Sequence, residues 1–440
     1  MPIPAPAGTL RHTGGCLQPV LLRGRADYID GGTGELIHRY TTVHEPGGVL
    51  PIACKTRRAS RCPPCAEVYR ADTYQVIRAG LSGGKGIPAT VAEHPCVFVT
   101  LTAPSFGPVH ARREKDGRVL ACRPRRKGKT CPHGIGLSCG EKHARDDHRL
   151  GEPLCPDCYD YTGAVLFNAH APELWRRFTI SLRRTLARQA GLTGKALATQ
   201  VRVSYAQVAE YQRRGVVRFH AIIRLDGPAG PAAAPPAWAT RAVLTAAIDQ
   251  AAVAVNVRTP AAPGLPPRTL AWGRQLDIRP VTTTGDVTHT TVAGYVAKCA
   301  TKAAEYTGAL DRRITPADRI ADLPVREHAR RHIAECLRLS KLPPLKKCAS
   351  PRGRTCSAFA ATSRQRAAPT PLLSARCAPI GPPISANTPS PSGCNRTSPA
   401  TPRSPLPTGT TPDADTRSST CWCRREVCHG PAPNDRPRGR

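Results

Sequence analysis

The pattern of apolar and polar positions predicts a mixed α+β chain up to about residue 340. Residues 96–102 form a short β-branched run, and residues 201–212 and 216–225 flank an Arg-Arg-Gly turn, as the two strands of a hairpin do. Residues 173–190 repeat large apolar side chains at helical spacing, which predicts an amphipathic helix. Other expected elements are helices over 66–79, 240–256 and from Asp286 or Thr288 to about 305, and a strand over 270–281.

The same patterns divide the chain into segments. Residues 1–53 are rich in Gly and Pro, and from about residue 341 Pro, Ser, Thr, Ala and Arg dominate while apolar periodicity is lost. Such a tail cannot bury a core and is expected to be disordered. The predicted order is an N-terminal segment (1–53), a cysteine knuckle and helix (54–95), a first core strand (96–107), a Cys/His-rich insertion (108–160), the rest of the core (161–340) and the tail (341–440).

The charge and the cysteine content narrow the range of possible partners and cofactors. The 440 residues contain 64 Lys and Arg against 31 Asp and Glu, a net charge of +33, which favours a polyanionic partner such as nucleic acid. The chain has no long apolar run, and residues 1–6 lack the features of a signal peptide, so we expect a cytoplasmic protein without a membrane partner. Disulfides are rare in that compartment, so the 19 cysteines suggest metal binding.

Two Cys-x-x-Cys pairs are candidate zinc knuckles, because two thiolates at this spacing can grip one tetrahedral ion. One interpretation is a single four-thiolate site made from both pairs. A second interpretation is two sites, with Cys54, Cys62 and Cys65 in one, and Cys131, Cys139, Cys155 and Cys158 in the other. The alternative to both is a set of reduced thiols that bind no metal. Full coordination by protein leaves no open position, so the zinc would be structural.

The hairpin carries a candidate catalytic cation site for Mg²⁺ or Mn²⁺. Two histidines at i and i+2 would face the same side of a strand, and His220 stands at the second of these positions while Arg218 stands at the first. Glu210 is expected to lie across the hairpin from Arg218, either as a further metal ligand or as an ion-pair partner of the arginine. An arginine cannot ligate a cation, but its guanidinium can contact a phosphate.

Tyr295 and Lys298 are one helical turn apart and form a candidate nucleophile and its helper. A tyrosine hydroxyl that attacks a DNA phosphate displaces a 3′-hydroxyl and leaves a 5′-phosphotyrosyl link, and a divalent cation assists by polarising the phosphate. The lysine would favour the phenolate or contact the phosphate. Three further cations are candidates for holding backbone phosphates: Arg213, Arg214 and Lys302.

These motifs occur together, in the same order, in a known family of proteins that the chain resembles. The order of Phe98-Val-Thr-Leu-Thr102, the near-match to His-hydrophobic-His at 218–220, and Val292-x-x-Tyr295-x-x-Lys298 resembles the three motifs of rolling-circle (HUH) replication initiators. More closely, the chain resembles actinobacterial plasmid initiators of the RepSA type over roughly residues 50–340. The stretches that carry this likeness include Cys62-Pro-Pro-Cys65, Leu101 to His110, Leu154 to Tyr161, Glu210 to Gly215 and Tyr295-Val-Ala-Lys298.

The resemblance implies an α+β fold, an antiparallel sheet with helices on one side, as in an HUH or RRM-like nuclease core. It implies a plasmid replication initiator that binds the origin and nicks single-stranded DNA, with host replication proteins as further partners. The chain departs from the family pattern at Arg218, where the family has His, and at Cys299, where it has Tyr. Weak or absent cleavage is therefore expected, and the alternative is a catalytically impaired DNA-binding remnant. A zinc-containing RNA-binding protein fits less well, because aromatic residues make up only 5% of the chain.

The tail suggests a change of reading frame. The family continues after residue 340 with a segment like Arg-Trp-Ala-His-x-Leu-Gly, and such a segment read one base out of register in GC-rich DNA gives something close to residues 354–364. We therefore hypothesise a frameshift near residues 341–354, against the alternative of a genuine basic tail that aids DNA binding. The coding DNA decides between them.

Overall fold

A computed structural model describes residues 13–124, 130–285, 287–301, 314 and 319–345. These residues form two units. The second unit consists of Val20–Ile52, and the first contains the described residues on either side of it. Several predictions lie outside the described residues: Lys302, the end of the helix expected to reach 305, the hypothesised frameshift from residue 346 on, and the disordered tail from the same point.

The first unit is built on a four-stranded antiparallel sheet with the strand order β12-β5-β9-β8. Its members are β5 (Cys96–Leu101), β8 (Arg202–Tyr211), β9 (Val217–Asp226) and β12 (Leu276–Pro280). The hairpin β8–β9 confirms the predicted pair of strands, and its register sets Glu210 opposite Arg218, as alternation predicts. Gly215 has a φ of 77° in the turn, a conformation that glycine adopts without strain.

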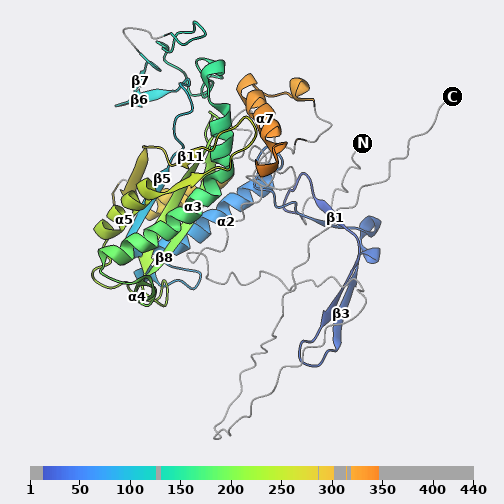
Figure 1. The fold of residues 1–440 in the computed structure, drawn as a ribbon. Coiled ribbons are helices and arrows are strands. Elements are labelled where there is room, and N and C mark those ends of the chain that lie inside the picture. Colours follow the sequence, from blue (N-terminus) through green and yellow to red (C-terminus); the bar gives the residue numbers. More distant parts are fainter. Residues whose placement is uncertain (1–12, 125–129, 286, 302–313, 315–318, 346–440) are drawn as a thin grey trace, which may run out of the picture. The chain divides into compact units, whose positions relative to one another are not determined.

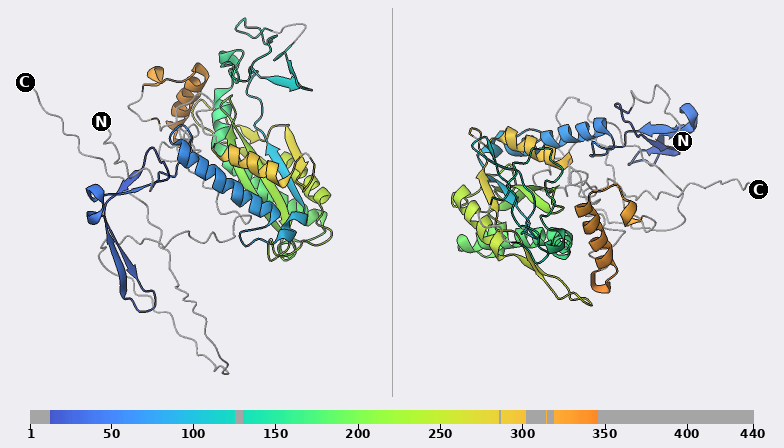
Figure 2. Two further views of the ribbon diagram at one scale, coloured as in Figure 1. Left: turned by 180° about the vertical axis from the view of Figure 1, so that it is seen from behind. Right: turned by 90° about the horizontal axis from the view of Figure 1, so that it is seen from above.

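Helices cover both faces of the sheet, so the expectation of helices on one side was wrong (Figures 1 and 2). On one face lie α3 (Tyr161–Gln189) and α5 (Arg241–Ala254), whose Phe178 and Ile248 pack with Phe219 of β9. On the other face lie α2 (Pro63–Ser82) and α6 (His289–Thr301), drawn in blue and yellow in Figure 2. The face of β9 toward α3 and α5 is apolar, whereas its other face carries Arg218, His220, Arg224 and Asp226 around Ile222. Most of these polar side chains are buried under the second pair of helices.

Two elements differ from their predicted limits. Helix α3 begins at Tyr161, well before residue 173, because Asp160 accepts a hydrogen bond from the Gly163 N–H at 2.9 Å and caps an additional stretch that is largely buried. The strand expected over 270–281 is two strands, β11 (Thr269–Ala271) and β12. Gly273 separates them: its N–H bonds the Thr102 carbonyl at 2.7 Å, and an added Cβ would lie 2.6 Å from the carbonyl oxygen of Ala103.

The Cys/His-rich segment 108–160 has little regular structure. Its described residues contain the hairpin β6 (Arg113–Lys115) and β7 (Arg118–Leu120), joined at a turn around Gly117, and several isolated bridges. Apart from candidate metal ligands, its buried apolar side chains are few, such as Val109 and Leu150. The segment therefore depends on something other than a hydrophobic core for its shape.

The second unit consists of two antiparallel strand pairs, which the sequence patterns did not predict. Strand β1 (Val20–Leu22) pairs with β4 (Leu50–Ile52), and β2 (Arg25–Ile29) pairs with β3 (Leu36–Thr41). The remaining elements belong to the first unit and are α4 (Gly194–Ala198), β10 (Asn256–Arg258), which pairs with β11, and α7 (Glu327–Ser340), which packs against α3. None of the described helices combines the length and the apolar character needed to cross a membrane.

Candidate active site and metal clusters

The polar residues of the hairpin converge on the face of the sheet that α6 covers. In the register of β8 and β9, Glu210 lies opposite Arg218, and in the register of β5 and β9, Thr100 lies opposite His220. Because side chains alternate along a strand, Arg218 and His220 project from the same face. Phe219, between them, projects into the opposite core.

The side chain of His220 is 2% exposed and contacts three neighbouring side chains. Its Nε2 lies 2.9 Å from Glu210 Oε2, and its Nδ1 lies 3.0 Å from Thr100 Oγ1. The ring of Phe98 stacks on the imidazole, with centroids 5.6 Å apart and planes inclined by 6°. A ring fixed in this way offers one nitrogen toward a reacting group with little freedom to turn away.

Arg218 occupies the place where a cation would share ligands with His220. Its Nε and Nη2 donate to Glu210 Oε2 at 3.0 and 2.8 Å, the same oxygen that faces the imidazole. The carboxylate is thus already neutralised by a guanidinium, which would repel a second cation at the same oxygen. Although Glu210 and His220 have the donor chemistry for Mg²⁺ or Mn²⁺, the site does not fit such an ion while Arg218 stays in this position.

Tyr295 reaches the same point from α6. Val292 and Val296 pack that helix against the sheet, and the Tyr295 hydroxyl lies 3.2 Å from His220 Nε2 and 3.4 Å from Arg218 Nη2. Tyr295 is 37% exposed, so a phosphate can approach it from solvent. Partial burial and the nearby Cys299 raise the pKa of its hydroxyl above the ordinary tyrosine value. A neutral phenol at physiological pH needs a base if it is to attack.

Two further residues of α6, Cys299 and Lys298, differ in their surroundings. Cys299 is buried, and its sulfur belongs to a group with ligand atoms of Glu210 and His220 that all lie within 4.8 Å of one another. The side chain of Lys298 is exposed and makes no hydrogen bond or ion pair within the described part of the chain, so its contribution to the reaction stays a prediction. Thr288 lies immediately before α6, and its hydroxyl accepts from the Thr291 N–H at 3.2 Å, as an N-terminal cap does.

The arginines of the hairpin turn bind backbone carbonyls. Arg213 donates to the carbonyls of Arg145 and Asp147 at 2.9 and 3.1 Å, and Arg214 donates to those of Ala103 and Pro104 at 3.0 and 2.9 Å. Both side chains therefore fasten the turn to neighbouring loops, and a contact with DNA stays a prediction for them. They line an open cavity of about 750 Å³ together with three other arginines, Arg112, Arg123 and Arg274.

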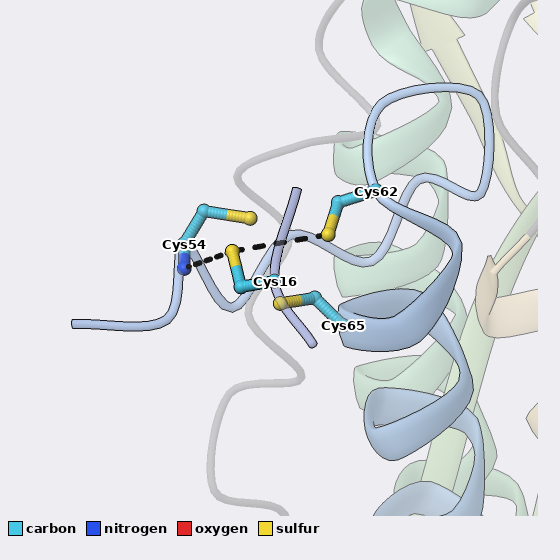
Figure 3. A group of neighbouring side chains, drawn as sticks. All are labelled: Cys16, Cys54, Cys62 and Cys65. Atoms are coloured by element: carbon cyan, nitrogen blue, oxygen red, sulfur yellow. Dashed lines mark hydrogen bonds between the residues drawn. The ribbon is translucent and has the colours of Figure 1, made fainter. Parts of the chain in front are cut away.

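Four cysteines of the first unit form a cluster at the start of α2, which we call cluster A (Figure 3). Cys62 immediately precedes α2 and Cys65 lies in its first turn, while Cys54 and Cys16 come from earlier in the chain. The sulfurs of Cys16 and Cys62 are 3.9 Å apart. Burial opposes ionisation of Cys62, but the N–H groups of Cys65 and Leu17 outweigh it and lower its pKa to about 7. Cys16 was missing from the predicted set.

The other predicted zinc ligands separate into two clusters, which corrects the set Cys131, Cys139, Cys155 and Cys158. Cluster C contains Cys131, His133, Cys155 and Cys158, and it lies just before α3. Cys139 lies elsewhere because its backbone pairs with Arg123, beside Cys122. The structure also places the Cys62 and Cys155 pairs in different clusters, so they do not form one four-thiolate site.

Cluster D contains His110, Cys122, Cys139 and His143. His143 Nε2 lies 3.5 Å from the sulfur of Cys139 and 3.2 Å from His110 Nδ1. The other nitrogen of His143 lies 2.7 Å from a carboxylate oxygen of Asp147. Arg149 and His143 hold the pKa of that carboxyl well below its usual range. Of these four ligands, only Cys139 was in the predicted set.

Comparison with known proteins identifies relatives over most of the chain. Residues 4–366 match the family described as "RepSA: Replication initiator protein, pSAM2". A replication initiator protein of Streptomyces ambofaciens is 51% identical over 342 residues, which cover 76% of this chain and 70% of that protein. No solved structure matches the chain.

Proposed function

Because the chain belongs to the RepSA family of replication initiator proteins, we propose that it binds single-stranded DNA at a plasmid origin and attacks a phosphate with Tyr295. One observation carries the proposal: the Tyr295 hydroxyl lies 3.2 Å from the fixed His220 Nε2, on a side chain that solvent reaches. An HUH-like core, cytoplasmic location and host replication proteins as partners belong to the same proposal. The net charge of +33 suits a DNA partner.

The proposed reaction exchanges one ester for another. The tyrosine oxygen bonds to phosphorus, the bond from phosphorus to the 3′ oxygen breaks, and the DNA retains a 5′-phosphotyrosyl link. The tyrosine proton passes to His220 Nε2, 3.2 Å from the hydroxyl oxygen. The imidazolium that forms donates to Glu210 Oε2, 2.9 Å away, and competes there with the guanidinium of Arg218, which binds the same oxygen. The leaving 3′ oxygen takes a proton from solvent, and His220 later returns its own.

In this proposal, Arg218 limits the rate of the reaction. In related initiators a divalent cation would polarise the phosphate, and in this chain the guanidinium stands beside the nucleophile instead, 3.4 Å from its oxygen. A guanidinium can bind a phosphate oxygen by hydrogen bonds, but it also keeps Glu210 and His220 from accepting a cation. We therefore propose slow nicking in this chain. The second candidate function, favoured by the same contact, is a DNA-binding initiator that no longer cuts.

The experiment measures covalent attachment to a single-stranded origin oligonucleotide that carries a fluorophore at its 3′ end. The original protein, Arg218→His and Arg218→Gln are incubated with it, with and without Mn²⁺, and separated under denaturing conditions. We expect a strong, Mn²⁺-dependent adduct from Arg218→His and at most a weak one from the other two. Absence of adduct in the original protein alone supports the non-cutting initiator. Absence in all three, with the oligonucleotide still bound, overturns the assignment of the site.

A further inference from the structure

The three clusters in the first unit share a composition that ordinary packing does not explain. Each brings four cysteine or histidine side chains together, and the twelve ligand atoms form three groups whose members lie within 4.8 Å of one another. All the cysteines concerned are free thiols in the structure. Four polarisable ligands converging on one point make a tetrahedral coordination set rather than a hydrophobic core.

The distances between ligand atoms match a tetrahedron around zinc. With Zn–S and Zn–N bonds of about 2.3 and 2.05 Å, the edges should be about 3.8 Å for two sulfurs, 3.6 Å for sulfur and nitrogen, and 3.3 Å for two nitrogens. The corresponding distances are 3.9 Å between the sulfurs of Cys16 and Cys62, 3.5 Å from Cys139 to His143, and 3.2 Å between His110 and His143. In cluster C, His133 Nδ1 lies 3.2, 3.6 and 4.0 Å from the sulfurs of Cys158, Cys155 and Cys131, a spread around the expected 3.6 Å. A disulfide would need sulfurs about 2.05 Å apart.

Outer contacts orient the ligands as they do around a bound metal. Backbone N–H groups point at three of the sulfurs: Cys54 N–H at Cys16, Leu17 N–H at Cys62, and Ala111 N–H at Cys122, at 3.1–3.4 Å. The carboxylate of Asp147 holds the second nitrogen of His143, an arrangement that fixes which nitrogen faces the metal. These contacts would stabilise thiolates and a correctly oriented imidazole.

The clusters tie together segments that lack a core of their own. In cluster A, Cys16 and Cys54 stand on either side of the second unit in the sequence, and both meet the start of α2. Cluster C joins the loop at Cys131 to the residues before α3. Beside cluster D, Arg213 binds the Asp147 carbonyl and connects this region to the turn between β8 and β9.

We propose that the chain binds three structural zinc ions, one in each of clusters A, C and D. The ligand sets are four sulfurs in A, three sulfurs and one nitrogen in C, and two sulfurs and two nitrogens in D. Each set is complete, so no zinc has an open position for substrate, and the ions act by holding the loops in place. This proposal is independent of the chemistry assigned to Tyr295.

The test is metal analysis of the full-length protein. We expect three zinc ions per chain, and X-ray absorption should give an average of three sulfurs and one nitrogen per zinc, since the three sets together hold nine sulfurs and three nitrogens. Cys62→Ser, Cys131→Ser and Cys122→Ser should each lose one ion, while Cys96→Ala, a buried cysteine outside the clusters, should keep all three.

Each alternative result is distinguishable. Fewer than three ions in the original protein, or iron in the place of zinc, overturns the proposal, as does a count that the cluster variants leave unchanged. If the variants fail to fold, the spectrum of the original protein still decides, because an environment dominated by nitrogen and oxygen contradicts the ligand sets. None of these results bears on whether Tyr295 attaches to DNA.

Discussion

The strand site and the three clusters each bring candidate metal ligands together, yet they differ in what surrounds those ligands. In cluster D, the Asp147 carboxylate holds the His143 nitrogen that faces away from Cys139, and the Ala111 N–H points at the sulfur of Cys122. At the strand site, the guanidinium of Arg218 lies directly on the oxygen that a cation would need. A metal site therefore requires both the right ligands and the absence of a competing cation. By that criterion the clusters could each hold a metal ion, whereas Arg218 blocks the strand site.

The largest effect should come from removing the nucleophile. Tyr295→Phe, introduced into Arg218→His, should reduce the covalent DNA adduct to background, because no other hydroxyl among the described residues lies as close to His220 Nε2 in this arrangement. Denaturing electrophoresis with labelled DNA measures the adduct. Tyr205→Phe, on the opposite face of the sheet against Trp175 of α3, is the control and should retain it. Equal adducts from both variants would move the nucleophile to another residue.

Removing zinc should have the next largest effect and should be local. Structural zinc contributes on the order of 10 kcal/mol to the folding of small domains, and residues 108–160 have few other buried contacts. After chelation, we expect proteolysis to cut within 108–160 while the sheet and α3 stay protected. Mass spectrometry of the fragments locates the cuts. Uniform protection of the chelated protein would show that the clusters do not hold these loops.

Two arginines on the same face of β9, Arg224 and Arg218, differ in burial and should differ in their effect on stability. Arg224 is fully buried, bonds Asp226 through two nitrogens and also donates to the Gly80 carbonyl of α2. Arg224→Met should lower the free energy of unfolding by about 3–5 kcal/mol, since the buried carboxylate of Asp226 loses its arginine and keeps only His94 and Ser204 as side-chain partners. Arg218→Met, at a side chain that is 30% exposed, should cost about 1 kcal/mol or less. Chemical denaturation measures both, and similar losses would contradict the distinction.

The reaction should also depend on pH. The raised pKa of Tyr295 keeps its hydroxyl protonated at neutral pH, so loss of that proton becomes easier as the pH rises. In Arg218→His, the rate of adduct formation should increase between pH 6 and pH 9, by at most about tenfold per unit. Rates from single-turnover experiments provide the measurement. A rate that falls over this interval would show that tyrosine ionisation does not limit the reaction.

The sequence predicted the strand site better than the clusters, for a physical reason. Alternation along two strands and a short turn fix which residues face each other, so the approach of Glu210 to Arg218 followed directly from the pattern. Ligand partners in loops depend on the path of the chain. Cys16 has no nearby cysteine in the sequence, and a whole unit separates it from Cys54. Helices on the second face of the sheet were also missed, because the polar residues of β9 on that face do not reveal a helical cover.

The most direct test of the blocked site is the binding of Mn²⁺, measured by electron paramagnetic resonance on zinc-loaded protein. Arg218→His should bind one more Mn²⁺ than the original protein, with an affinity at least about tenfold higher at that site, equivalent to about 1.4 kcal/mol. Adding Glu210→Gln to Arg218→His should abolish the gain. Equal Mn²⁺ binding by the original protein and Arg218→His would contradict the conclusion that the arginine occupies the place of the cation.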